Sequence, residues 1–295
     1  MSNSKYSFSD SPSDKKRKRK KKRRKKHSIA KRIVLIVILV ILLCIIAVGA
    51  YSCFLIKSNY DDIQGALEDL DTNGISQASK SEVYDGDGNL LTEISGSEFR
   101  NVVTFSAYES SYIIPAVIST EDTRFYSHNG IDVIRIFGAF VADIRHRGAA
   151  QGGSTITMQL ARNAVLNSQD KTIDRKIKEA IVSLKLEKMY TKNEILTFYL
   201  NEVFMGQNIY GIGSAANYYF NKDVSDLTLS ECATLVGMLP SPNAYSPATD
   251  MDKAIRVRNQ VLDNMVKNNA ITEAEADSAK AEDIVLNIHK PEEST

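Results

Sequence analysis

The sequence predicts a mostly α-helical domain that is preceded by one transmembrane helix. Residues 33–56 contain no charged side chain over 24 positions. As a helix they would span roughly 36 Å, which exceeds the roughly 30 Å of a bilayer core. Beyond residue 105, three Thr-x-x-Glu sequences mark helix starts, because each pairs an N-cap threonine with a glutamate three residues later. They begin at Thr191, Thr228 and Thr272.

Charge is distributed unevenly along the chain. Residues 1–32 hold 15 of the 37 Lys and Arg residues but only two of the 36 Asp and Glu residues. A basic run can bind nucleic acid. Beside an apolar segment, membrane orientation and attraction to anionic headgroups explain it better, so we expect no nucleic-acid partner and a cytoplasmic N-terminus. The expected organisation is a basic cytoplasmic tail (1–32), a transmembrane anchor (33–56), a stalk (57–80) and an extracytoplasmic domain (81–295).

Local patterns place further elements in the outer domain. In residues 81–94, two β-prone runs flank DGDGN, which predicts a hairpin. A calcium loop does not fit, because Leu90 stands where such a loop needs glycine. Residues 173–190 carry an apolar stripe at helical spacing, and the helix from Leu229 should end near Pro240. The three cysteines form no CxxC pair, which predicts free thiols.

The first candidate segment for chemistry is STEDTRFYSHNGID, residues 119–132. Adjacent helical residues point about 100° apart, so Glu121 and Asp122 should have different roles. A carboxylate at the end of an apolar run is partly desolvated, which raises its pKa toward the range of a general base. Phe125 and His128 would wall such a site. The alternative is a capping pair on a solvated loop.

The second segment is GAAQGGSTITMQLARN, residues 148–163. Gly153 allows close backbone approach, and Ser154 or Thr155 can cap the helix that follows. Free N–H groups and the helix dipole would make its N-terminus an anion site. Glycines before a helix are common, and the unusual feature is the density of polar side chains on this helix: Thr157, Gln159, Arg162 and Asn163.

The third segment is KTIDRKIKEAIVSLKLEK, residues 171–188. Glu179 lies four residues after Arg175 and three after Lys176, which fits a surface ion pair. It also fits a carboxylate held among cations that bind a phosphate group, with Lys171 and Lys178 as further candidates. No Walker, Rossmann or Ser/His/Asp pattern occurs, so we expect no organic cofactor.

Together these segments resemble the peptidoglycan glycosyltransferases of family 51. EDTRFYSHNGID resembles their first motif, QGGSTITMQLARN the second and RKIKE the third. YLNEVFMGQNIYGIGSAANYYFNK (199–222) and LTLSECATLVGMLPSPNAYSP (227–247) resemble the fourth and fifth. All five occur in the family's order. Met158 stands where the family has the first of two paired glutamines, and Gln159 keeps the second. No Ser-x-x-Lys sequence follows the five motifs, so the chain resembles the monofunctional members of the family, which lack a transpeptidase domain.

The resemblance implies a lysozyme-like, mostly helical fold with a small membrane-proximal lobe. It implies polymerisation of lipid II at the outer face of the cytoplasmic membrane, with inversion and loss of undecaprenyl pyrophosphate. Expected partners are lipid II, the growing lipid-linked strand, the membrane and other cell-wall synthesis proteins. A divalent cation, Mg²⁺ or Mn²⁺, is the candidate cofactor.

The resemblance also assigns roles to residues. Glu121 would be the general base and Glu179 the second carboxylate, near the pyrophosphate. Asp122 would orient the local backbone or site. The expected substrate-binding residues are Asp122, Phe125, His128, Gly153, Ser154, Thr155, Thr157, Gln159, Arg162, Asn163, Lys171, Arg175, Lys176, Lys178 and Asn201.

Two questions stay open from the sequence. Apolar residues near the cleft could dip into the membrane interface or form an ordinary core; they are the run Ile113–Ile118 and Ile134, Ile136, Phe137 and Phe140. The domain could also be a glycan-cleaving enzyme of the same fold, or an inactive scaffold. The basic cluster of the third segment speaks against a hydrolase, and the intact acids Glu121 and Glu179 speak against a scaffold.

Overall fold

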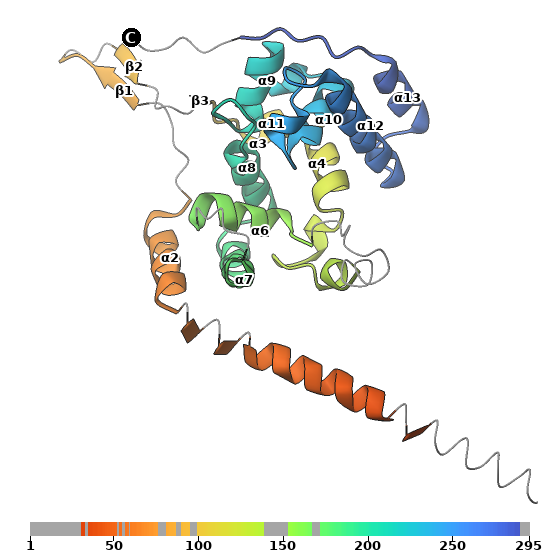
Figure 1. Cartoon of the computed structure of the whole chain (residues 1–295). Helices are drawn as coiled ribbons and strands as arrows, with labels where there is room; N and C mark the ends of the chain where they lie inside the picture. The colour runs from red at the N-terminus through yellow and green to blue at the C-terminus, as the bar shows by residue number, and fades with distance from the viewer. Residues whose placement is uncertain are drawn as a thin grey trace, which may run out of the picture. The chain divides into compact units, whose positions relative to one another are not determined.

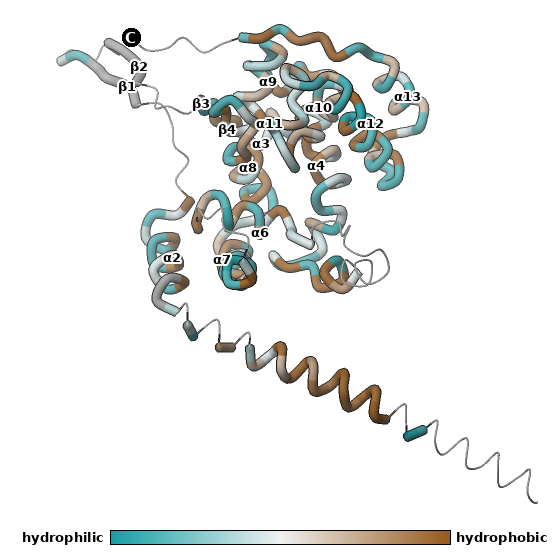
Figure 2. Tube along the Cα trace, in the orientation of Figure 1, coloured by the Kyte–Doolittle hydropathy of each residue, from teal (hydrophilic) through white to brown (hydrophobic). Residues whose placement is uncertain are grey.

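The structure is a computed structural model that divides into two compact units, residues 1–58 and 59–295. It describes residues 31–32, 35–51, 53–54, 57–58, 60–75, 81–86, 90–94, 99–138, 153–166 and 172–289. Residues 35–51 are helical and almost entirely hydrophobic (Figure 2). Within these described ranges, no helix has both the length and the hydropathy of a membrane span. Part of the expected anchor 33–56 and most of the basic tail lie outside the described residues, so both stay predictions.

The larger unit is mostly helical, which confirms the expected fold class (Figure 1). Its α-helices are α2 (Tyr60–Asn73), α3 (Phe105–Glu109), α4 (Ile113–Glu121), α6 (Ile156–Leu160), α7 (Ile173–Met189), α8 (Lys192–Glu202), α9 (Ile212–Phe220), α10 (Leu229–Met238), α11 (Pro242–Tyr245), α12 (Met251–Lys267) and α13 (Glu273–Ala281). Shorter turns are η1 (Phe125–Ser127), the π-helical η2 (Ala161–Val165) and η3 (Val224–Asp226).

Two small β elements accompany the helices. Strands β1 (Ser81–Tyr84) and β2 (Leu90–Ile94) pair antiparallel around DGDGN, so the predicted hairpin is confirmed. Strands β3 (Phe99–Arg100) and β4 (Ile209–Tyr210) pair in parallel. This second pairing joins segments far apart in the chain and fixes the residues just before α3 beside the loop that follows α8.

Helix starts follow the capping chemistry that the sequence predicts. Complete capping boxes begin α8, α10 and α13. In the first, the Glu194 carboxylate accepts the Thr191 backbone N–H at 2.7 Å. This bond and that of the Thr191 hydroxyl hold the pKa of Glu194 below its usual range. Helix α10 ends two residues before Pro240, also as predicted.

The core lies around α10, which packs side by side with α12 and also contacts α4 (Figure 1). Gly237 permits this close approach, because a Cβ there would lie 2.9 Å from the Val257 Cγ2. All three cysteines are free thiols, as predicted. Burial of Cys232 inside α10 raises the pKa of its thiol to about 12, which keeps it protonated and unreactive.

The apolar stripe that predicted α7 is not the face that α7 buries. Ile173 is 64% exposed and Leu184 is 42% exposed. The buried residues are Glu179, Val182, Ser183 and Leu186. The helix forms where it was predicted, but its orientation is set by a buried carboxylate and its partners.

The expected stalk, residues 57–80, contains a helix that packs on the domain. Leu70 of α2 is 1% exposed and belongs to the main core. Helix α2 contacts α7 (Figure 1), and Lys185 pairs with Asp71 across this contact at 2.6 Å. The Tyr190 hydroxyl also accepts the N–H of Ile75 at 3.2 Å.

The two sets of apolar residues proposed for the membrane interface have different environments. Ile113 and Val117 are fully buried and belong to the core, so the alternative of an ordinary core holds for the run Ile113–Ile118. Ile134 and Phe137 are 70% and 66% exposed. Ile136 is also exposed, whereas Phe140 lies outside the described residues.

Arg258 joins the C-terminal helices from inside the domain. Its side chain is 2% exposed, although it lies on α12. Its guanidinium donates to the Ser230 hydroxyl at 3.1 Å and to the carbonyls of Lys280 and Glu282 at 2.9 and 2.6 Å. These carbonyls lie at the end of α13, where backbone acceptors lack helical partners.

We predict that Arg258→Ala lowers the free energy of unfolding by about 2–4 kcal/mol, because it strands buried acceptors and opens a cavity. Chemical denaturation monitored by circular dichroism would measure the loss. Arg256→Ala is the matched control, since Arg256 is exposed on the same helix and should change stability by no more than about 0.5 kcal/mol. Equal effects of the two changes would contradict the role of Arg258.

Candidate active site

Asp122 is a fully buried carboxylate at the end of α4. It accepts the His128 Nε2 hydrogen at 2.9 and 3.1 Å and the backbone N–H of Ile156 at 3.0 Å. Ile156 is the first residue of α6. A buried carboxylate is stable only when such donors replace water. Asp122 therefore binds the end of α4 to the start of α6.

This arrangement changes the interpretation of the α6 N-terminus. Thr155 is its N-cap and accepts the Met158 N–H at 3.1 Å. The Thr155 hydroxyl donates in turn to the Gly130 carbonyl at 2.6 Å. The sequence predicted an anion site here, and the anion that contacts this helix start is the protein's own Asp122. Gly130 also lies against α7, and glycine is required there because a Cβ would lie 2.9 Å from the Ser183 carbonyl oxygen.

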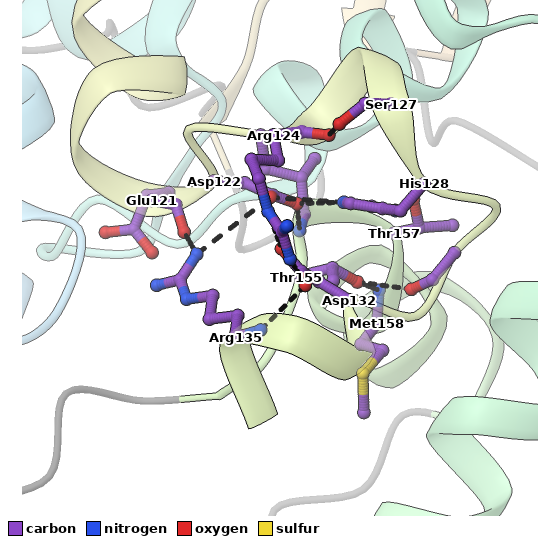
Figure 3. Close-up of polar contacts among 12 residues, drawn as sticks. Glu121, Asp122, Arg124, Ser127, His128, Asp132, Arg135, Thr155, Thr157 and Met158 are labelled. Atoms are coloured by element: carbon purple, nitrogen blue, oxygen red, sulfur yellow. Dashed lines mark hydrogen bonds and ion pairs between the residues drawn. The ribbon is translucent and has the colours of Figure 1, made fainter. Parts of the chain in front are cut away.

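Glu121 differs sharply from its neighbour. It is half-buried, and its Oε2 accepts the Gln159 Nε2 hydrogen at 2.9 Å. Gln159 Oε1 contacts the Tyr199 hydroxyl at 3.2 Å. In Figure 3 the Glu121 carboxylate points away from the cluster around Asp122. The two adjacent acids thus have the separate environments that the sequence predicted.

Two arginines hold the loop between α4 and the helical residues 133–138. Arg135 donates to the Glu121 carbonyl and lies 4.0 Å from Asp122, while Arg124 pairs with Asp132 (Figure 3). Burial acts to raise the pKa of Asp132, but the hydrogen bonds and charge of Arg124 and the N–H of Arg135 outweigh it and leave this pKa lowered. The carboxylate is therefore ionised and caps the helical residues 133–138.

Phe125 and Thr157 support the site through their contacts with the ion pair of Lys192 and Glu187. Phe125 is fully buried, with the Lys192 ammonium 4.4 Å from its ring centre. Lys192 also pairs with Glu187 at 2.7 Å, and the Thr157 hydroxyl donates to the same carboxylate at 2.6 Å. Both residues thus pack and brace the site. Met158 is 4% exposed and packs, which explains how it replaces a glutamine.

Glu179 is fully buried on α7 between two cations. Lys176 Nζ lies 2.7 Å from one carboxylate oxygen and also donates to the Ser154 hydroxyl at 2.6 Å. Arg175 Nε lies 3.1 Å from the other oxygen, but without the alignment of a hydrogen bond. The surface-pair interpretation of this cluster is therefore wrong, because Glu179 is a buried acid that positions both cations.

A cleft of about 680 Å³ lies beside these groups. From α6 and η2 it is lined by Gln159, Arg162 and Asn163, and from α7 by Arg175. The π-helical turn presents Arg162, whose Nε donates to the Asn163 side chain at 3.1 Å. The other residues that line it come from β3 and from elements after α7: Arg100, Tyr199, Glu202, Val203, Phe204, Tyr210, Leu239, Pro240 and Pro242.

The remaining predicted residues fall into three groups. Asn201 is 3% exposed, and its amide bonds the Val103 backbone at 2.9 and 3.0 Å and the Tyr108 hydroxyl at 2.8 Å. It holds the chain before α3 in place rather than lining the cleft, and its substrate role stays a prediction. Gly153 and Lys178 are described but do not line it, and Lys171 lies outside the described residues.

Sequence reasoning missed Tyr199 and Arg100. Tyr199 falls within the fourth motif but looks like any core aromatic, and Arg100 precedes the first motif. Arg100 lies 4.5 Å from the Tyr210 ring centre and 2.9 Å from the Glu202 carboxylate. Only the β3–β4 pairing, which joins residues about a hundred positions apart, brings it to the cleft.

A metal site is not evident in the geometry of the acids. No three metal-ligating His, Cys, Asp or Glu side chains cluster within the described ranges. Both Glu179 oxygens face cations, and the oxygens of Asp122 face His128 and a backbone N–H. These two carboxylates therefore do not fit a divalent ion in the arrangement seen, and we derive no step through one.

Comparisons with known proteins match the part of the chain that contains these residues. A family model described as Transglycosylase matches residues 87–266. Penicillin-binding protein 1A of Escherichia coli (strain K12) is 38% identical over 250 residues, which cover 84% of this chain and 29% of that protein. Penicillin-binding protein 1A/1B of Bacillus subtilis (strain 168) is 42% identical over 212 residues, covering 72% and 23%.

The chain thus spans less than a third of the length of these relatives. A crystal structure of penicillin-binding protein 1A from Haemophilus influenzae aligns with a TM-score of 0.40 and 23% identity, over 73% of this chain and 22% of that one. The family match covers well over half of the sequence. The chain belongs to the transglycosylase family, and its helical domain is homologous to the glycosyltransferase domains of class A penicillin-binding proteins.

Proposed function

We propose that this protein polymerises lipid II into β-1,4-linked glycan strands, with Glu121 as the general base. The 4-hydroxyl of the acceptor attacks the anomeric carbon of the lipid-linked donor strand. The bond from that carbon to the pyrophosphate oxygen breaks, the configuration inverts, and Glu121 takes the hydroxyl proton. The undecaprenyl pyrophosphate leaves with the bonding electron pair.

The contrast between the two adjacent acids carries this proposal. Asp122 is fully buried and surrounded by donors, so it has no capacity left for a substrate proton. Glu121 is half-buried, and Gln159, which lines the cleft, holds one of its oxygens. A general base must lie within hydrogen-bond reach of its proton. The contact of Glu121 with a residue that lines the cleft supports this role for Glu121 over Asp122.

The charge of the cleft supports a pyrophosphate leaving group. Arg162 and Arg175 line it, and Glu179 orients Arg175 from behind. Negative charge grows on the leaving group as the bond breaks, so cations fixed in advance stabilise the transition state more than the ground state. A hydrolase would gain little from them, because it releases no pyrophosphate.

The proposed substrates also account for the exposed apolar residues 133–138. Ile134 and Phe137 face solvent on the segment that Arg135 connects to Glu121. Lipid-tethered substrates reach high effective concentration at a site held near the headgroups. We propose that this segment contacts the bilayer and that the domain works at the outer face of the cytoplasmic membrane, where it meets lipid II and the growing strand.

We predict that Glu121→Gln lowers polymerisation of labelled lipid II by roughly 10²- to 10⁴-fold, since it keeps the shape of the side chain and removes its basicity. Its thermal unfolding should match that of the wild type. Asp122→Asn is the informative comparison, because it disturbs a buried network and should cost about 2–3 kcal/mol of stability. Near wild-type polymerisation by Glu121→Gln would place the base elsewhere.

We predict that Arg162→Ala lowers turnover of lipid II by roughly 10- to 100-fold, because it removes a cation from the cleft. The double change Arg175→Ala with Lys176→Ala would strand the buried Glu179 and also cost stability, so Arg162 gives the cleaner test. Lys188→Ala, an exposed lysine on α7, is the control and should leave turnover unchanged. If both variants had the same turnover, the charge of the cleft would no longer support a pyrophosphate leaving group.

The substrate itself separates the polymerase from a glycan-cleaving enzyme. We predict that the full-length protein in detergent forms polymer from lipid II and leaves purified, lipid-free glycan intact. Gel separation of labelled products measures the first, and release of soluble fragments measures the second. Cleavage of purified peptidoglycan without polymer from lipid II would overturn the proposed function.

A further inference from the structure

We propose that Tyr199 is a positioning residue that acts through Gln159 on Glu121. Its hydroxyl fixes which end of the Gln159 amide faces the base, and this sets the orientation of the Glu121 carboxylate. The inference rests on the proposed role of Glu121, and it concerns a residue to which the sequence assigned no role.

The geometry is a chain of three side chains from three helices. Tyr199 lies on α8, Gln159 on α6 and Glu121 at the end of α4. The Tyr199 hydroxyl is 3.2 Å from Gln159 Oε1, and Gln159 Nε2 is 2.9 Å from Glu121 Oε2. Helix packing holds each member, because α6 contacts α8 and Tyr199 is 1% exposed.

Chemistry determines the direction of both hydrogen bonds. An ionised carboxylate only accepts, so the NH₂ group of Gln159 must face Glu121. The amide oxygen then faces Tyr199, and the tyrosine hydroxyl must donate to it. Reversing the amide would set its oxygen against the Glu121 carboxylate. The arrangement is therefore consistent when Tyr199 donates to the amide oxygen and the amide NH₂ donates to Glu121.

The environment of Tyr199 makes it a permanent donor. Burial raises its pKa well above the usual range, and the negative charge of Glu121 raises it further. The hydroxyl thus stays protonated throughout any working pH, and its proton is not transferred in the reaction.

The network also distinguishes the two oxygens of Glu121. Oε2 accepts from Gln159, whereas Oε1 has no hydrogen-bond partner in the part of the chain that the structure describes. The proton from the acceptor hydroxyl should therefore go to Oε1, and the bond from Gln159 to Oε2 persists through the step. Tyr199 and Gln159 keep this oxygen in one position before the substrate arrives. A catalytic group that is oriented in advance increases the rate.

Other charged groups face the same network. Asp122 adjoins Glu121 in the chain, and Arg135 binds the Glu121 carbonyl. Arg162 and Asp122 act on Tyr199 with opposite signs. The remaining charged residues that line the cleft are Arg100, Arg175 and Glu202. None of these is altered by a change at Tyr199, so a loss of kcat caused by that change reports on the hydroxyl.

The test is the steady-state kinetics of lipid II polymerisation by the full-length protein in detergent. Tyr199→Phe removes only the hydroxyl. We expect kcat to fall about tenfold with KM unchanged, because the base is no longer held in one orientation while substrate contacts stay intact. Tyr219→Phe is the matched control: Tyr219 is another fully buried tyrosine, whose hydroxyl donates to the Met205 carbonyl and which does not line the cleft.

A second variant keeps the test decisive if the phenylalanine change impairs folding. Gln159→Leu removes the direct donor and should also lower kcat. The variant with both changes should lose no more kcat than Gln159→Leu alone, because Tyr199 acts only through Gln159. Additive losses of kcat would overturn the proposal. So would a rise in KM alone, which indicates substrate contact.

Glu121→Gln in the same assay separates this inference from the proposed function. If that variant keeps its activity, Glu121 is not the base and the proposed function fails. If that variant is inactive while Tyr199→Phe behaves as Tyr219→Phe does, the base is correct and the role of Tyr199 is wrong.

Discussion

The structure of the site depends on a carboxylate that has no access to water. Ionised Asp122 is tolerated inside the domain only because His128 and the Ile156 N–H replace its hydration. These donors come from a loop and from a helix more than thirty residues away. Satisfying one charge therefore closes the loop after α4, sets the start of α6 and leaves Glu121 at the edge of the buried region.

The domain uses its acids in two ways. Asp122 and Glu179 are both fully buried, and each organises donors or cations around itself. Glu121 is only half-buried, and it contacts Gln159, which lines the cleft. Breaking a buried charge pair costs more than forming it contributes, so the buried acids favour a single arrangement over alternative ones. Two side chains that line the cleft are held in the same way, since Gln159 and Arg175 each contact one of these three acids.

Local chemistry made much of the fold predictable. The three capping boxes, the hairpin at DGDGN and the end of α10 depend on neighbouring residues, so the sequence shows them directly. The orientation of α7 was not predictable in this way, because its buried face includes Glu179 in preference to Ile173. An exposed isoleucine and a buried glutamate reverse the usual signal, and only the partners Lys176 and Ser154 explain it.

The candidate site was predictable as a set of residues but not as an arrangement. Sequence predicted different roles for the two adjacent acids, and the structure shows that their environments differ. Sequence also assigned the α6 N-terminus to a ligand, but Asp122 occupies it. Tyr199 and Arg100 reach the cleft through packing between distant segments, which leaves no local pattern.

The π-helical turn at Ala161–Val165 limits how the chain length can change here. Its wider turn closes with the Leu166 N–H on the Ala161 carbonyl at 2.9 Å, five residues apart. Such a turn contains one residue more than the α-helix it interrupts. Deleting a single residue would restore regular helix and rotate every later side chain by about 100°. Substitutions in this turn are thus a local matter, whereas a one-residue deletion would change the direction in which the chain leaves the cleft.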